Sequence, residues 1–303
     1  MGIALSHAGR PEEALRASRK SLAISQKLAD ANPAVTQFQD KLAISLENLG
    51  MSLLERGRPE EGLLACRKAL AICQKLADAN RAVTRFQYEL AVFCSGNGLC
   101  LLSMGKPVEA ADAERKASDI MQKLVADQPT NTEFQAQLAR SQTNIGRALD
   151  RQKRFAEAFT ALEKVLVIYQ NLDSSDAGYS HVNRGGARAR TGQPAEAAAD
   201  LRRALELWAK VPHLDLLTQV ERSRALALLA GLGGNAKSGV TKDDARTFAD
   251  QSVATLADAV QSGWALPSEL NEPDFDALRG RDDFRKLVAE VEAKAGPRAK
   301  LRD

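Results

Sequence analysis

One turn segment recurs along the chain at a fixed spacing. It reads GRPEEAL from residue 9, GRPEEGL from residue 57, GKPVEAA from residue 105 and KRFAEAF from residue 153, so each copy starts 48 residues after the previous one. A fifth copy, GQPAEAA, follows 39 residues later. A second block, AISQKLADANPAVTQFQDKLA from residue 23, returns as AICQKLADANRAVTRFQYELA from residue 71. Such self-similarity is typical of solenoids, whose units pack on their neighbours.

Each copy predicts a pair of amphipathic helices. In the stretch LENLGMSLLERGRPEEGLLACRKA, which runs from Leu46 to Ala69, small residues at Gly50 and Ala69 would let the two helices approach closely. Pro59 suits the first turn of the second helix because the backbone N–H groups of a first turn have no acceptor within the helix, so the N–H group that proline lacks is not missed. The apolar stripes of the two helices are expected at Leu46, Leu49, Leu53 and at Leu63, Cys66, Leu70.

This order of small and large positions closely resembles the tetratricopeptide repeat, a helix–turn–helix unit of about 34 residues. The longer period is read as two helices of about five to six turns each, as in kinesin-light-chain-like members of the family. The period also resembles the repeats of large bacterial proteins, notably those of planctomycetes. The resemblance implies an all-α, right-handed superhelical solenoid of antiparallel helix pairs and a cytoplasmic protein–protein interaction scaffold.

The repeat phase predicts three regions. Residues 1–212 hold about five units, and residues 213–262 form a degenerate closing pair. Residues 263–303 form a cap and a frayed basic tail from Pro297. The chain is expected to begin midway through a first helix, either as a fragment or at a start codon inside a longer array. The expected helices are 1–8, 11–31, 35–56, 59–79, 83–104, 107–127, 132–152, 155–172, 179–191, 194–210, 214–232 and 244–262.

The cap resembles the "DPDFDPLR…F..LL" terminus common after bacterial tetratricopeptide arrays, including those after serine/threonine kinase domains. Asp274 is expected to cap a short turn and Asp282 a last helix. The apolar residues of this plug, expected to bury against the closing pair, are Phe275, Leu278, Phe284 and Leu287. Within the repeats, Gly96-Asn97-Gly98 predicts a local kink in the helix 83–104 because glycine is unfavourable in a helix interior.

Several site types are disfavoured. The four cysteines, Cys66, Cys73, Cys94 and Cys100, show no metal-ligand spacing and are expected to pack as small apolar residues. A net charge of +3 with no clustered basic face does not favour nucleic acid. No apolar run is long enough to span a membrane. We therefore expect no metal, no cofactor, no nucleic-acid partner and no membrane partner.

Two motifs are read as structural. The opening MGIALS fits a lipidation pattern, but Gly2 stands 48 residues before Gly50 and is read as the repeat's own crossing glycine. GLGGNAKS, residues 231–238, lacks one glycine of the phosphate-loop pattern at Ala236. The segment before it reads as helix rather than strand, so a helix–helix loop is expected there.

The leading functional interpretation is a non-catalytic scaffold. The three histidines are scattered, and no Ser or Cys nucleophile occupies a recognisable motif. In this family, peptides lie in the groove made by the first helices of successive units. Matching the motif places these groove candidates: Asn48, Met51, Leu54, Leu99, Leu102, Asn144, Arg147, Arg151 and Asn183.

The groove candidates divide by chemistry. Early units offer apolar residues, and later units offer Arg140, Arg147, Arg151 and either Arg188 or Arg190, which would suit an acidic–hydrophobic peptide. Two alternatives stay open: the asparagines are merely solvated or cap turns, and the arginines pair with Asp150 or Glu133. A different functional class is the C-terminal sensor of a larger signalling enzyme, such as a bacterial serine/threonine kinase.

Overall fold

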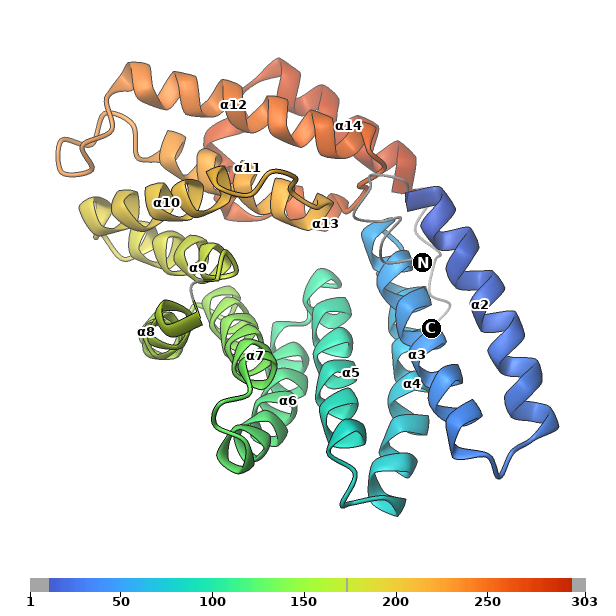
Figure 1. Cartoon of the computed structure of the whole chain (residues 1–303). Helices are drawn as coiled ribbons and strands as arrows, with labels where there is room; N and C mark the ends of the chain where they lie inside the picture. Colours follow the sequence, from blue (N-terminus) through green and yellow to red (C-terminus); the bar gives the residue numbers. More distant parts are fainter. Residues whose placement is uncertain (1–10, 173, 296–303) are drawn as a thin grey trace.

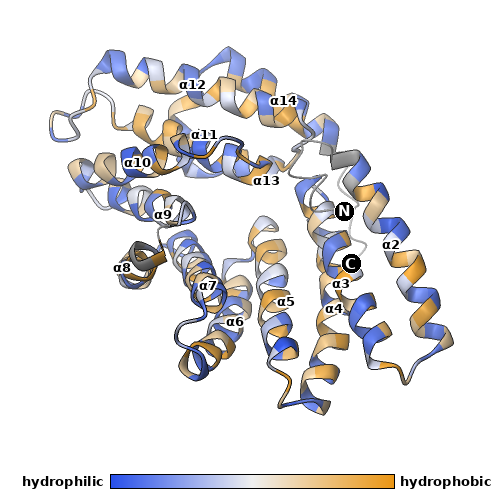
Figure 2. Cartoon of the chain, viewed as in Figure 1, coloured by the Kyte–Doolittle hydropathy of each residue, from blue (hydrophilic) through white to orange (hydrophobic). Residues whose placement is uncertain are grey.

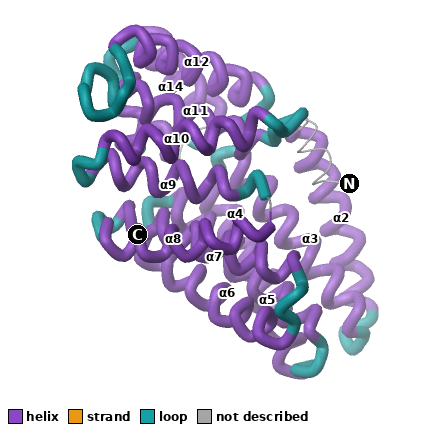
Figure 3. The backbone as a smooth tube through the Cα atoms, turned by 60° about the vertical axis from the view of Figure 1, so that its left-hand side comes forward, coloured by secondary structure: helices purple, strands orange, loops and turns teal. Residues whose placement is uncertain are grey.

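The structure, a computed structural model, describes residues 11–172 and 174–295, and these residues form helices joined by short loops without any strand (Figures 1 and 3). The all-α prediction is therefore confirmed. The expected helix 1–8 and the tail from Pro297 lie outside the described residues. The helices are α2 (Pro11–Ala31), α3 (Thr36–Glu55), α4 (Pro59–Ala79), α5 (Thr84–Ser103), α6 (Pro107–Asp127), α7 (Thr132–Arg151), α8 (Phe155–Leu172), α9 (Ala177–Arg190), α10 (Pro194–Ala209), α11 (Leu216–Gly231), α12 (Lys242–Gln261), α13 (Pro267–Leu270), the 3₁₀ helix η1 (Pro273–Leu278) and α14 (Asp282–Ala295).

Consecutive helices pack as antiparallel pairs, and the pairs stack into a curved solenoid (Figure 1). Hydrophobic and hydrophilic residues alternate around each helix, as neighbour-to-neighbour packing requires (Figure 2). Within the described part of the chain, no helix is both long and apolar enough to cross a membrane.

The turn inside each pair uses a left-handed backbone residue. Gly57, Gly105 and Gly192 have φ angles of 69°, 71° and 78°. In the fourth unit Lys153 occupies the equivalent place with φ 61°, although a side chain there is strained. The geometry of the repeat therefore imposes the left-handed backbone conformation on Lys153, although non-glycine residues disfavour it.

The predicted helix crossing is present, because each first helix brings a glycine against a side chain of the second. A Cβ atom at Gly50 would overlap the Cys66 sulfur and lie 3.0 Å from the Gly62 carbonyl oxygen. Leu162 and Leu201 fill the corresponding place beside Gly146 and Gly185. Close approach at this position thus recurs from unit to unit.

The paired glycines of α5 serve a different purpose from the expected kink. Helix α5 continues through Gly96 and Gly98 without interruption. A Cβ atom at Gly96 would overlap the Glu47 carboxyl group, and one at Gly98 would lie 2.9 Å from Glu114 Oε1. The glycines therefore make room for two carboxyl groups buried against α5, one from α3 and one from α6.

These carboxyl groups differ in their hydrogen bonding. Ser95 Oγ lies 2.8 Å from Glu114 Oε2, and the Asn144 side-chain amide donates to Glu114 Oε1 at 2.8 Å. Glu47 Oε2 has no hydrogen-bond partner. Burial raises the pKa of each carboxyl group from its ordinary value of 4.5 to about 8.

The apolar residues of the C-terminal plug pack as predicted, but the two expected caps are corrected. Phe275, Leu278, Phe284 and Leu287 are buried in one apolar cluster with Leu256 and Val260 of α12. The Phe275 and Phe284 rings stack with centroids 5.9 Å apart. Asp274 does not cap a turn, because it lies inside η1 and is itself buried between arginines. Asp282 is the first residue of α14, and its carboxylate accepts from the Arg285 side chain.

The plug also reaches beyond the closing pair. Its apolar cluster continues through Leu54 of α3, Cys66 of α4 and Leu101 of α5, so the end of the chain packs back on the early units. The four free cysteines are buried, in agreement with the packing role expected for them.

Replacement of Gly50 by Ala tests the helix crossing. The added Cβ would overlap Cys66, so Gly50→Ala should lower the free energy of unfolding by about 1–3 kcal/mol. Gly280→Ala is the matched control, because a Cβ atom there meets nothing within 4 Å. Urea denaturation monitored by circular dichroism measures both changes. Equal stability of the two variants would contradict a close crossing at Gly50.

Replacement of Glu47 by Gln tests its burial in the neutral form. The unfolded chain loses this proton near pH 4.5, whereas the folded chain keeps it to about pH 8. The resulting stabilisation is complete below about pH 4.5 and is lost as the pH rises through about 8. The gap in melting temperature between Glu47→Gln and wild type should therefore shift in favour of the variant between pH 5 and pH 9. Glu163→Gln, at an exposed carboxylate, is the control; a pH-independent gap for Glu47→Gln would contradict the burial argument.

Candidate functional site

The sequence-predicted groove residues lie on four first helices. Asn48, Met51 and Leu54 are on α3, and Leu99 and Leu102 are on α5. The remaining members are on α7 and α9: Asn144, Arg147, Arg151 and Asn183.

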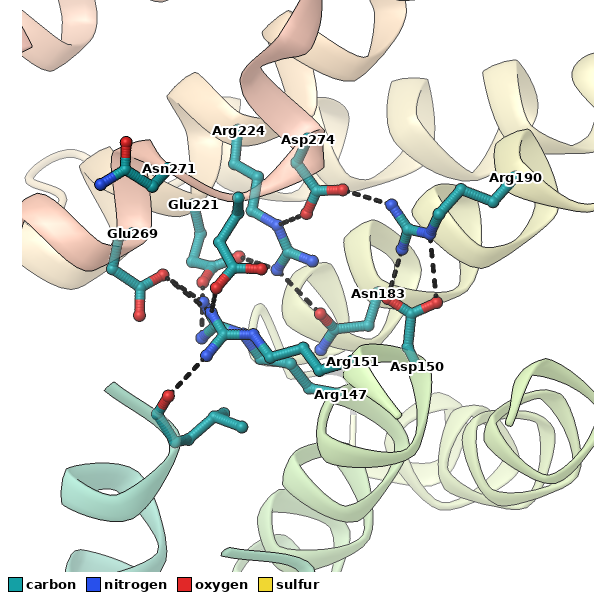
Figure 4. A network of polar contacts seen from close by, with 12 residues as sticks. Arg147, Asp150, Arg151, Asn183, Arg190, Glu221, Arg224, Glu269, Asn271 and Asp274 are labelled. Carbon is teal, nitrogen blue, oxygen red and sulfur yellow. Dashed lines mark hydrogen bonds and ion pairs between the residues drawn. The ribbon is translucent and has the colours of Figure 1, made fainter. Parts of the chain in front are cut away.

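Two of the arginines of α7, Arg147 and Arg151, are largely shielded from solvent. Arg147 pairs with Glu269 of α13, and its Nη1 lies 3.1 Å from Glu221 Oε1 of α11. Arg151 Nη1 donates to the Leu102 carbonyl oxygen at 2.7 Å, and its Nη2 lies 3.0 Å from Glu272 Oε1. Figure 4 shows these side chains converging from α7, α11 and the segment around α13.

A second group of ion pairs, continuous with the first through Glu221, joins α9 and α11 to η1. Asp274 accepts from both Arg190 and Arg224, and Arg190 also pairs with Asp150 of α7 (Figure 4). Arg224 Nη1 lies 3.0 Å from Glu221 Oε2 and 2.8 Å from the Asn183 side-chain oxygen. We call the whole set the arginine network; its members are Arg147, Arg151, Arg190, Arg224, Asp150, Glu221, Glu269, Glu272 and Asp274.

The arginine network holds its central carboxylates in the charged form. Burial alone would raise the pKa of Asp274, but the adjacent Arg224 and Arg190 guanidinium groups hold it well below the usual range. The pKa of Glu269 is lowered in the same way, against burial, by Arg147 and Arg151. Breaking a buried pair on one side leaves an uncompensated charge, which typically costs about 3–5 kcal/mol. The arginine network is therefore a strong link between the repeats and the cap.

The later basic candidates are also paired. Arg140 lies 2.7 Å from Asp176, and Arg188 lies 2.7 Å from Asp200, which also binds Arg184 and His181. Of the two acidic partners suggested by the sequence, Asp150 pairs with Arg190 rather than with the α7 arginines. The open basic half that the sequence suggested is thus occupied by carboxylates of the same chain.

The apolar candidates meet the same C-terminal segment. Leu54 and Leu102 are buried members of the apolar cluster that also contains Leu266, Leu270 and Phe275. Met51 and Leu99 are half-buried and pack against that cluster. An acidic and apolar stretch, residues 264–278, therefore shares an apolar cluster with the apolar candidates and pairs with the basic candidates Arg147 and Arg151.

The three asparagines have different surroundings. Asn144 donates to Glu114, and Asn183 accepts from Arg224. The Asn48 side chain is half-buried, and within the described residues its amide makes no hydrogen bond. Of the three asparagines, only Asn48 has no side-chain hydrogen bond to the described residues, so its whole side-chain amide can bond another molecule.

Sequence reasoning missed the acidic half of the arginine network. Glu221 and Arg224 lie on α11, to which the groove pattern was not extended. Glu269, Glu272 and Asp274 stand beside Leu270 and Phe275, a spacing that matches the acidic–hydrophobic ligand inferred for the groove. That match is the sequence feature from which binding of this segment to the groove of its own chain could have been predicted.

The phosphate-loop resemblance is resolved as a helix–helix loop. The Gly234 N–H donates to the Val240 carbonyl oxygen at 3.1 Å, and Ser238 Oγ donates to the Leu232 carbonyl oxygen at 2.9 Å. Helix α11, not a strand, precedes the loop. Across residues 11–172 and 174–295, no group of His, Cys, Asp and Glu side chains is arranged to hold a metal ion.

Comparison with solved structures finds the same fold in several proteins. The apo form of RapI superposes with a TM-score of 0.64 at 12% identity, covering 97% of this chain and 95% of that chain. BtubC (BKLC) from P. vanneervenii gives 0.59 at 17% identity, covering 84% and 93%. A Rap protein complexed with competence and sporulation factor gives 0.59 at 13% identity, covering 96% and 74%.

Sequence comparison locates the repeat family. No curated protein matches the chain significantly. Residues 42–80 and 138–172 match the family model described as tetratricopeptide repeat. These segments span most of the α3–α4 pair and most of the α7–α8 pair, where the helix crossings are found. These two segments are similar to tetratricopeptide repeats, and the solved structures show that the chain shares their helical fold.

Proposed function

We propose that this protein is a non-catalytic interaction scaffold that binds an acidic–hydrophobic segment of a partner along its first helices. The observation that carries the proposal is the way residues 264–278 are held. Their carboxylates pair with arginines of α7, α9 and α11, while Leu266, Leu270 and Phe275 join the apolar cluster. This face therefore has the chemistry needed to hold such a segment, because arginine pairs well with carboxylates.

The accessible part of this face lies on α3 and α5. Met51 and Leu99 are half-buried, and Asn48 has an unbonded side-chain amide. In the proposal these residues meet the partner first: the amide bonds the partner's backbone, and Met51 and Leu99 contact an apolar anchor. Met side chains adapt readily to different apolar groups.

The candidates that already have partners inside the chain take a supporting role. Leu54, Leu102, Asn144, Arg147 and Asn183 are held by contacts inside the chain, and they fix the shape of the face. Arg151 lies at the edge between the two groups, because its partner Glu272 is more exposed than Glu269 and Asp274. A carboxylate of the partner can exchange with Glu272 there without disturbing Asp274.

The structural neighbours support binding as a use of this fold. One Rap protein of the same fold is complexed with competence and sporulation factor. A role as the C-terminal sensor of a larger signalling enzyme, such as a bacterial serine/threonine kinase, remains a prediction from sequence, as do a planctomycete-like origin and a cytoplasmic location.

A peptide-library screen tests the proposal. Wild-type protein should enrich peptides that combine carboxylates with Leu or Phe. Asn48→Ala/Met51→Ala should weaken binding of the enriched peptides by about tenfold, which corresponds to about 1.4 kcal/mol. Leu64→Ala/Val108→Ala removes exposed apolar groups from the second helices α4 and α6 and serves as the matched control.

Two results would count against the proposal. One is a screen that enriches no acidic–hydrophobic peptide. The other is equal affinity of the Asn48→Ala/Met51→Ala variant and the control for the enriched peptides, with melting temperatures showing that both variants are folded.

A further inference from the structure

Three basic side chains of helix α9 share one carboxylate of helix α10. Arg184 donates to both oxygens of Asp200, from Nε to Oδ2 at 2.8 Å and from Nη2 to Oδ1 at 2.7 Å. Arg188 Nη1 donates to Oδ2 at 2.7 Å, and His181 Nδ1 lies 3.0 Å from Oδ1. We call His181, Arg184, Arg188 and Asp200 the α9–α10 basic cluster.

The α9–α10 basic cluster contains more positive than negative charge. Burial alone would raise the pKa of Asp200, but hydrogen bonds from His181 and Arg184 and the charge of Arg188 lower it below its ordinary value. The carboxylate is therefore ionised, and His181 Nδ1 donates to it. Across residues 11–172 and 174–295 no second acidic side chain pairs with these bases, so two guanidinium groups share a single negative charge.

Several nitrogens of the α9–α10 basic cluster remain without a partner. Arg184 Nη1, Arg188 Nη2 and His181 Nε2 make no hydrogen bond with the described residues, and neither does Arg188 Nε. Of these four nitrogens only Arg188 Nε is fully buried. The three side chains are 16%, 17% and 18% exposed for His181, Arg184 and Arg188, so their outer nitrogens are open to a small ligand.

Helix α8 holds Arg188 from a further side. Its Cζ atom lies 6.0 Å from the centroid of the Phe159 ring, a distance at which a cation is attracted to the face of an aromatic ring. Arg188 is thus fixed between Asp200 and Phe159 without the use of Nη2. A guanidinium group that is already held in place loses little conformational freedom when it binds an anion.

The preceding units show that a helix pair of this repeat packs without these charges. Counted from the turn segment of each unit, the position of Arg188 holds a leucine in all three, and the position of Asp200 holds an alanine. The leucines, which are all buried, are Leu53, Leu101 and Leu149, and the alanines are Ala65, Ala113 and Ala161. The fifth unit therefore replaces an apolar contact by partly buried charges, which are costly to desolvate. An ion pair that only joined α9 to α10 would need one arginine for this carboxylate, not two.

We propose that the α9–α10 basic cluster binds a phosphoryl group. Its free nitrogens come from three side chains, which suits the three oxygens of a phosphate monoester better than the two of a carboxylate. Two guanidinium groups and Asp200 leave one positive charge, and His181 adds a second when its ring is also protonated at Nε2. A phosphate monoester carries about −1.5 to −2 charges at pH 7, and it favours that cationic ring. The cluster shares no residue with the face formed by Asn48, Met51 and Leu99.

Isothermal titration calorimetry with two kinds of probe tests the proposal. Inorganic phosphate, added to the full chain in a phosphate-free buffer, should bind saturably at one ion per protein. A phosphoserine peptide, Gly-Gly-phosphoserine-Gly-Gly, is compared with its unphosphorylated form. Arg188→Leu introduces the residue of the preceding units, and Arg184→Gln removes the other guanidinium group. Each should weaken phosphate binding by at least about tenfold, because hydrogen bonds to charged groups are strong.

Arg203→Leu is the matched control. It removes an exposed arginine of α10 that pairs with Glu206 outside the cluster, so it should bind phosphate like wild type. Thermal melting monitored by circular dichroism establishes that each variant is folded, and Arg184→Gln carries the test if Arg188→Leu is not.

The two kinds of probe also distinguish the source of the phosphoryl group. Tighter binding of the phosphoserine peptide than of inorganic phosphate assigns the site to a phosphorylated protein, and the reverse order or equal affinity assigns it to a small phosphate compound. The proposal is overturned if neither probe binds saturably, if acetate binds as tightly as phosphate, or if the unphosphorylated peptide binds as well as the phosphorylated one. It is also overturned if the folded Arg184→Gln and Arg188→Leu variants bind like wild type, or if Arg203→Leu weakens binding as much as they do.

Discussion

A pair of amphipathic helices cannot cover its own apolar surface, and the rest of this structure follows from that constraint. Gly50 and its equivalents let the two helices of a pair touch, while each second helix still exposes a side to the next unit. Neighbouring pairs cover those sides through the middle of the chain. The last pair is covered by the plug of residues 264–291.

The arginine network fixes the position of the plug on the repeats more closely than apolar packing alone. Apolar contacts alone would tolerate small shifts of the plug, but Asp274 meets Arg190 and Arg224 from two different helices at once. Buried ionic groups need their partners in good geometry, so the plug has one favourable position on α7, α9 and α11. The same carboxylates determine how much of the face remains accessible, which is why Asn48, Met51 and Leu99 are prominent in the proposed function.

Periodicity predicted the helices well because most of their boundaries follow local rules: Pro in the first turn of the second helix and Gly just after the first helix, with Phe155 and Lys153 as the exceptions in the fourth unit. Helices α3 to α10 begin and end within a few residues of the expected positions. The same rules failed where a distant partner decides the outcome. Gly96 predicted a kink because the Glu47 carboxyl group that fills the space beside it belongs to another helix. For Arg147 the sequence offered an open groove position or pairing with Asp150 or Glu133, and it missed the actual partner, Glu269, which lies 122 residues away. Pattern reasoning selected the residue types of the candidate site but could not identify which were already paired.

The return of the plug to the early units changes how the chain should fold. An open solenoid is held by contacts between residues close in sequence, so its units can form and melt almost one at a time. Here Leu54 shares a cluster with Leu266 and Phe275, and Arg147 bonds Glu269. Contacts of such long sequence separation carry a large loop-closure cost before they stabilise anything. The array should accordingly form these long-range contacts slowly. Once they have formed, the repeats and the plug should unfold together, as a globular domain does.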